Sequence, residues 1–95
     1  MKKYEAMFIL KPDLNEEAKK ALLNQIGEAI TKNGGSVTQG SIWTEKKKLY
    51  FPLKKQHEGL YYLVNFNSPT EALVKINHAY KLNEDVLRVL ITAKE

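Results

Sequence analysis

Cysteine is absent from this chain of 95 residues, which excludes disulfide bonds, thiolate zinc sites and thiol catalysis. Glycine and proline are sparse as well, at 5 and 3 residues, while 43% of the residues are hydrophobic. This composition is typical of a globular domain rather than of a disordered chain. We therefore expect one domain that spans residues 1–95.

Long hydrophobic runs are also missing. The apolar segment that follows the charged N-terminus, Ala6–Leu10, has only five residues and ends at Lys11-Pro12. A signal peptide needs about 7–15 apolar residues and a membrane-spanning helix about 20. The sequence therefore predicts a cytoplasmic protein that has no membrane partner and whose first strand begins near the N-terminus.

No pattern for catalysis, metal binding or cofactor binding is found. The chain contains no G-x-S-x-G, no P-loop and no G-x-G-x-x-G. His57 and His78 fall on separate elements, and neither has a partner at metal-ligand spacing. We expect no enzymatic activity, no cofactor, no metal and no small-molecule substrate.

Lysine is the residue that the chain does have in excess. The net charge is +4, and fourteen of the fifteen positive residues are lysine, with Arg88 the only arginine. Five lysines fall within the segment 46–55, around the strand-forming residues Leu49-Tyr50-Phe51. Such clustering is typical of a surface that meets phosphate, but an edge strand also uses lysine to avoid pairing with another copy. Because lysine reads base edges poorly, sequence-specific recognition in a groove is not expected.

Hydrophobic periodicity predicts the order β-α-β-β-α-β. Strands are expected at residues 4–10, 37–53, 60–66 and 86–93, and helices at 16–32 and 69–80. Asn15 is predicted to cap the first helix, Ser68–Glu71 to form a capping box for the second, and Gly40 to form a bulge or a bend. Two β-α-β halves with right-handed crossovers predict an α+β fold, the ferredoxin-like sandwich, with a four-stranded antiparallel sheet and both helices on one face.

Strand alternation assigns side chains to the two faces of this sheet. The helix-covered face is expected to carry Ala6, Phe8, Leu10, Tyr62, Val64, Phe66, Leu87, Val89 and Ile91. The open face is expected to carry Met7, Ile9, Tyr61, Leu63 and Leu90, beside Glu5, Asn65 and Arg88. An open face this apolar predicts a docking surface for a protein partner, although the long second strand or an oligomer contact could also cover it.

Two other functional classes share this topology. Acylphosphatases hold phosphate in a loop after the first strand that contains glycine and arginine, and Lys11–Asn15 contains neither. RNA-recognition modules stack bases on aromatic residues of the third strand. Glu58–Asn65 matches their signature only at Gly59 and Tyr62, so a stand-alone binder of single-stranded RNA that uses Tyr61 remains the alternative function.

Four segments together carry a family resemblance. They are the opening Met1-Lys2-Lys3-Tyr4-Glu5, the loop Lys11-Pro12-Asp13-Leu14, the basic segment Lys47–Lys55 with Pro52-Leu53-Lys54-Lys55, and the segment Lys81–Arg88 with its Asn83-Glu84-Asp85-Val86 core. Over essentially its whole length the sequence resembles the bacterial small-subunit (30S) ribosomal protein six family. It departs from the family pattern at Tyr50 and Phe51, where a small residue and then tyrosine are usual, and at Glu45, where glycine is usual.

The resemblance implies a structural component of the small ribosomal subunit. Such a protein would bind the central domain of small-subunit rRNA, on the platform, together with ribosomal protein eighteen as its heterodimer partner. The open face would then meet this protein partner. The family motif positions Lys2, Lys3 and Arg88 are expected to contact phosphate first, and Lys47, Lys48 and Lys54 second. For the second group a solvated surface charge explains the sequence equally well.

Overall fold

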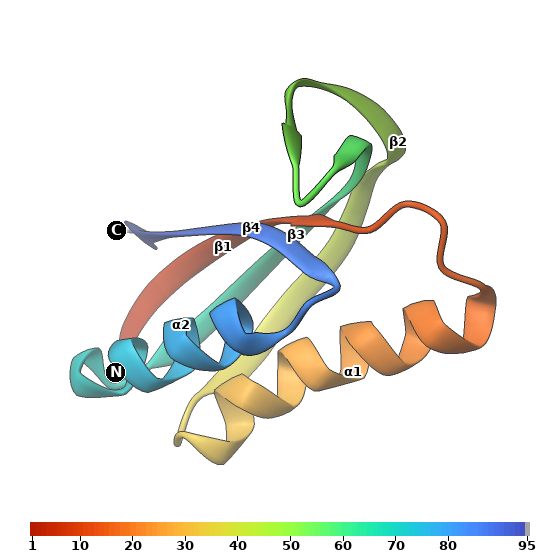
Figure 1. Cartoon of the computed structure of the whole chain (residues 1–95). Helices are drawn as coiled ribbons and strands as arrows, with labels where there is room; N and C mark the ends of the chain where they lie inside the picture. The colour runs from red at the N-terminus through yellow and green to blue at the C-terminus, as the bar shows by residue number, and fades with distance from the viewer. Residues whose placement is uncertain (95) are drawn as a thin grey trace.

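The chain folds as a four-stranded antiparallel sheet whose two helices lie on the same side (Figure 1). This computed structural model describes residues 1–94. The strand order is β2-β3-β1-β4, so β2 and β4 are the edge strands. The elements are β1 (Lys2–Leu10), α1 (Glu16–Lys32), β2 (Ser36–Leu53), β3 (Gln56–Ser68), a 3₁₀ turn (Thr70–Ala72), α2 (Leu73–Leu82) and β4 (Val86–Lys94). The predicted element order and architecture are confirmed.

The first helix begins and ends where its sequence indicates. The Asn15 side chain accepts a hydrogen bond from the Ala18 backbone N–H at 2.7 Å. At the other end Gly34 has a φ of +86°, and the Gly35 N–H donates to the Ile30 carbonyl at 2.9 Å. This left-handed glycine satisfies helix carbonyls and reverses the chain into β2.

The predicted capping box of the second helix is wrong. Ser68 is the last residue of β3, where it is buried opposite Lys2. Its hydroxyl donates to the Pro69 carbonyl at 2.9 Å and does not cap the helix. Because strand pairing fixes Ser68, a 3₁₀ turn starts the helical segment instead.

The core lies between the sheet and the two helices. Alternate residues of β1, beginning with Tyr4 and ending with Leu10, are buried on this side. The Phe8 ring meets the Tyr80 ring edge-on, with ring centroids 4.8 Å apart. The Tyr80 hydroxyl donates to the Ile26 carbonyl at 2.7 Å and so ties α2 to α1. The other large core side chains are Leu22, Ile30, Leu60, Val64, Phe66, Ile76 and Val86.

Strand β4 departs from the strict alternation that the sequence predicts. Leu10 pairs with Val86 and Ile9 with Arg88, so Leu87 is an extra residue at a β-bulge. Val86 therefore joins the core, and Leu87 is buried beside it. Farther along this edge strand Val89 and Ile91 are half-buried and pack against the core, on the helix-covered side where they are expected.

Gly40 is not itself a bulge, because it pairs regularly with Val64. The irregular pairing lies on either side of it, between Val37 and Gln39 and beyond Ile42. A Cβ atom at position 40 would collide with the phenol group of Tyr62. The glycine is thus needed for the cross-strand packing of this half-buried tyrosine.

Candidate functional site

The open face of the sheet brings the five predicted partner-face residues together. Met7 lies between Leu63 of β3 and Leu90 of β4, and in the next row Ile9 lies beside Tyr61. Leu90 is 58% exposed and the other four are half-buried. No helix covers these residues, because both helices lie on the opposite side (Figure 1). The predicted placement of this apolar surface is therefore confirmed.

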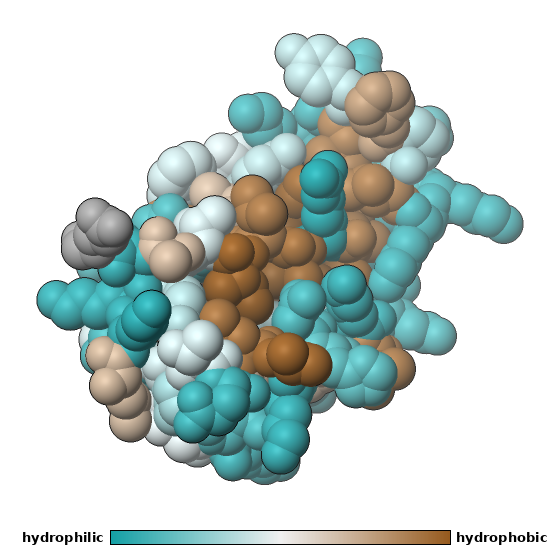
Figure 2. Space-filling view, turned by 90° about the vertical axis from the view of Figure 1, so that its left-hand side faces the viewer, coloured by the Kyte–Doolittle hydropathy of each residue, from teal (hydrophilic) through white to brown (hydrophobic). Residues whose placement is uncertain are grey.

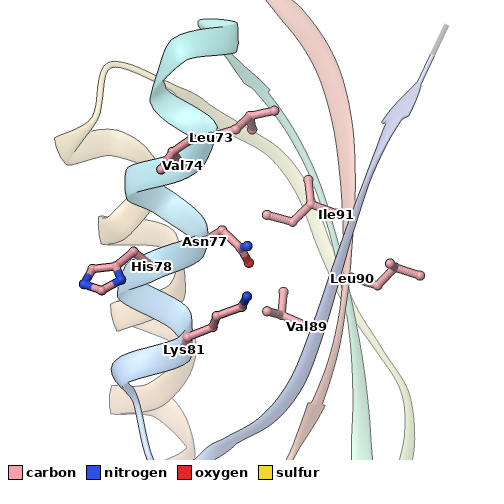
Figure 3. A pocket seen from close by; sticks show the side chains of 8 residues that line it. All are labelled: Leu73, Val74, Asn77, His78, Lys81, Val89, Leu90 and Ile91. Atoms are coloured by element: carbon pink, nitrogen blue, oxygen red, sulfur yellow. The ribbon is translucent and has the colours of Figure 1, made fainter.

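The close view of β4 shows the two faces separately (Figure 3). Val89 and Ile91 project toward α2, whereas Leu90 projects away from it. A shallow groove of about 550 Å³ runs between α2 and β4, and it is lined by Leu73, Asn77 and other residues of both elements. In the space-filling view, apolar side chains form a continuous patch with hydrophilic side chains along its margins (Figure 2).

The β2–β3 hairpin covers one end of the open face. Gly59 is buried there, and a Cβ atom on it would overlap Cγ2 of Ile9 and lie 3.6 Å from Cδ2 of Leu49. The Lys47 ammonium lies 5.3 Å from the centre of the Tyr61 ring, at cation–π distance. The long second strand thus shields the Ile9 end, while Leu90 stays exposed.

Polar groups lie at the other end of the apolar surface and form its edge. The Lys94 ammonium lies 3.5 Å from the Glu5 carboxylate and donates to the Asn65 side-chain oxygen at 3.1 Å. Lys3 lies between Asn67 and Lys94 in the outermost row. The open face therefore has an apolar centre and charged margins, as expected of a protein-binding surface.

The first group of predicted phosphate contacts does not form one cluster. Lys3 is on the open face, whereas Lys2 pairs with Ser68 and belongs to the helix-covered side. Arg88 pairs with Ile9, six residues along β1 from Lys3, a separation of about 20 Å. These three cations can therefore contact only separate phosphates.

The second group is divided as well. Lys47 lies over Tyr61, while Lys48 pairs with Glu58 and so belongs to the other face of the hairpin. Lys54 reaches across the molecule, and its ammonium donates to the Val86 carbonyl at 3.0 Å. Its role thus includes a structural contact that the sequence did not indicate.

Three cations come together at the start of β4. Lys54, Lys81 and Arg88 line a cavity of about 220 Å³ beside Tyr80. Within residues 1–94 none of the three forms a salt bridge. Lys81 lies in the last turn of α2. The sequence did not indicate Lys81 as a binding residue, because only the hairpin and the β-bulge bring it close to Lys54 and Arg88.

Carboxylates neutralise the base of the hairpin. Glu45 accepts a hydrogen bond from the Lys19 ammonium at 2.8 Å, and this contact lowers the pKa of the Glu45 carboxyl. Lys46 lies 3.5 Å from Asp13. Among the described residues, Lys47, Lys48 and Lys55, farther out on the hairpin, form no salt bridge.

Other types of site are not indicated by the described part of the chain. The His78 ring projects away from β4 (Figure 3), and residues 1–94 hold no group of three potential metal ligands. Neither of the helices in that range is long and apolar enough to cross a membrane.

Comparison with known proteins identifies a family. Residues 3–93 match the family model of ribosomal protein S6. The chain is 41% identical over 91 residues to small ribosomal subunit protein bS6 of Caldanaerobacter subterraneus subsp. tengcongensis, covering 96% of this chain and 95% of the relative. It is 42% identical to the bS6 protein of Thermoanaerobacter pseudethanolicus, with the same coverage. The crystal structure of 30S ribosomal protein S6 from Thermotoga maritima has the same fold, with a TM-score of 0.87 and 22% identity over 98% of this chain and 87% of that one.

Proposed function

Because the chain belongs to the ribosomal protein S6 family of the small ribosomal subunit, we propose that it binds small-subunit rRNA together with ribosomal protein eighteen. The expected site is the central domain of the rRNA, on the platform of the cytoplasmic ribosome. The family assignment agrees with the resemblance seen in the sequence, and it confirms a structural rather than an enzymatic protein.

The apolar open face is the observation that carries the protein-binding part of this proposal. The row Leu63–Met7–Leu90 has no helix above it, and a sheet face exposed to water normally alternates to polar residues. Burial of these side chains against a second protein removes apolar surface from water, at about 25 cal/mol per Å². Ribosomal protein eighteen is the partner that we assign to this face.

Cations beside the open face support the RNA-binding part. Arg88 lies in the row next to Met7, and Lys54 and Lys81 share a cavity with it. Phosphate contacts at these residues would lie next to a protein bound over Leu90. Lys3, at the far end of the face, provides a second and separate contact. Lys2, on the helix-covered side of the sheet, is also a proposed phosphate contact. So is Lys48, on the face of the hairpin opposite Lys47.

The alternative, a stand-alone RNA binder that stacks a base on Tyr61, is less well supported. Tyr61 is half-buried between neighbours, and Lys47 already occupies one side of its ring. A base could stack on that side only after displacing the lysine.

Truncation of the open face tests the proposal directly. We expect Met7→Ala and Leu63→Ala each to weaken association with ribosomal protein eighteen about tenfold or more, as truncation of a central interface residue does. The measurement is isothermal titration calorimetry of the two purified proteins without RNA. Val74→Ala is the matched control, because Val74 is 76% exposed on α2, on the other side of the sheet. Unchanged association of both variants would contradict the assignment of this face.

A further inference from the structure

The tip of the β2–β3 hairpin, residues 49–55, carries aromatic side chains that the fold does not use. Tyr50 is 100% exposed and Phe51 is 77% exposed. The strands pair at Lys48–Glu58 and again at Leu53–Gln56, so the four residues 49–52 lie opposite the single residue 57. This four-against-one irregularity leaves the two rings in solvent, and the hairpin rises above the sheet and curls back toward β4 (Figure 1).

Specific contacts hold the hairpin tip in place. The hydrogen bond from Lys54 to the Val86 carbonyl joins it to β4, and Leu49 packs at the buried Gly59 beside Ile9. The turn itself has Lys54 and Lys55 at φ values of +47° and +67°, a left-handed geometry that usually requires glycine or asparagine. The chain therefore keeps a disfavoured turn, and the contacts of Lys54 and Leu49 position the backbone that carries the two exposed rings.

The charge of the hairpin tip indicates what these rings bind. Among the residues that the structure describes, Lys47, Lys48 and Lys55 form no salt bridge. Unpaired lysines on both sides of exposed aromatic rings match a single nucleic-acid strand, whose bases stack on the rings while its phosphates contact the cations. A neutral apolar partner would match the rings but leave the lysines without a counter-charge.

We propose that the hairpin tip binds unpaired nucleotides of an RNA strand. Tyr50 and Phe51 stack on nucleobases, and Lys48 and Lys55 contact the adjacent phosphates. This inference rests on the proposed function and adds to it a second RNA contact, which is separate from the open face and from Tyr61.

The test uses the full chain and a fluorescently labelled ten-nucleotide RNA of mixed sequence, as a single strand and as a duplex. Fluorescence anisotropy at low salt is expected to show preference for the single strand. Tyr50→Ala and Phe51→Ala should each weaken this binding by about 5- to 150-fold, the range for loss of one base–aromatic stack. Tyr50→Phe should retain it, because a phenylalanine ring also stacks. Val74→Ala serves again as the exposed apolar control.

The salt dependence separates the rings from the lysines. Lys48→Gln and Lys55→Gln should each reduce the slope of log K against log salt concentration by about 0.7, whereas the aromatic variants leave the slope unchanged. No binding of the wild-type chain to the single strand, or equal binding of wild type and Tyr50→Ala, would overturn the inference.

Two further results would assign the hairpin tip to a protein instead. One is weaker association of Tyr50→Ala with ribosomal protein eighteen in the absence of RNA. The other is self-association of the wild-type chain in sedimentation that Phe51→Ala abolishes. Either would overturn an RNA-binding tip without touching the proposed function, which depends on the open face. Conversely, the proposed function would be contradicted if this chain together with ribosomal protein eighteen failed to bind rRNA. That conclusion would hold whatever the binding of the ten-nucleotide RNA.

Discussion

At the scale of single residues, Tyr80 joins three elements of the core. Its ring packs edge-on against Phe8 of β1, and its hydroxyl donates to the Ile26 carbonyl of α1. Burial of the phenol raises the pKa of Tyr80 well above its ordinary value, and the nearby Tyr62 contributes to the same shift. The hydroxyl is thus held protonated in the folded state.

Tyr80→Phe is expected to destabilise the protein by about 1 kcal/mol at neutral pH, the usual net contribution of one hydrogen bond. The alkaline response follows from the raised pKa. The contribution of Tyr80 to stability is fully present below its unfolded-state pKa of about 10, and it is lost as the pH rises toward the folded-state pKa. Urea unfolding at neutral and alkaline pH measures both effects.

The control for this substitution is Tyr50→Phe, because Tyr50 is fully exposed. Its unfolding free energy should match that of the wild type at every pH. If Tyr80→Phe loses as much stability as the wild type on going from neutral to alkaline pH, ionisation of Tyr80 is not the cause of the alkaline loss.

At the scale of elements, the β2–β3 hairpin differs most from an ordinary antiparallel pair. Its pairing shifts at several places between Val37 and Leu53, and most of β2 is exposed. The base is held by the Lys19–Glu45 ion pair to α1, and the tip by Lys54 to β4. Two separate contacts therefore position a strand whose own ladder is irregular.

Lys54→Met tests the contact at the hairpin tip, because methionine keeps much of the apolar stem but cannot donate to the Val86 carbonyl. We expect faster hydrogen exchange of the backbone amides at residues 50–57, with a loss of less than about 1 kcal/mol in global stability. Lys48→Met, at an exposed lysine on the same hairpin, should leave this exchange unchanged. Unaltered protection in Lys54→Met would show that Leu49 and Gly59 hold the tip without the lysine.

At the scale of the whole molecule, charge and apolar surface are distributed unevenly. Carboxylates pair with Lys11, Lys19 and Lys46, near the start of α1 and the base of the hairpin. Unpaired cations remain at the start of β4 and on the outer hairpin. A net charge of only +4 makes strong, independent binding to rRNA unexpected, and this agrees with binding as a pair.

The test at this scale compares rRNA binding by this chain alone with rRNA binding by the chain together with ribosomal protein eighteen. We expect tight binding only by the pair, with a slope of log K against log salt concentration steeper than for either protein alone, since the cations of both release counterions. Filter binding to a central-domain rRNA fragment across a salt series measures this. Equally tight binding by the chain alone would contradict joint assembly and favour the stand-alone RNA-binding alternative.

The sequence by itself determined the element order, the first helix with its Asn15 cap and glycine end, and the apolar open face around Met7. These features follow from local rules, because periodicity, capping and strand alternation depend on residues that are neighbours in the chain. The family resemblance in the sequence was likewise confirmed by the match over residues 3–93.

Only the tertiary structure decided where the charged groups lie relative to one another. The bulge at Leu87 moved Val86 into the core, and the strand register separated Lys3 from Arg88 by most of the length of β1. The bend of the hairpin brought Lys54 to Lys81 and Arg88. Register and bulges are set by pairing between strands that are distant in sequence, so no local pattern could show which cations would share a surface.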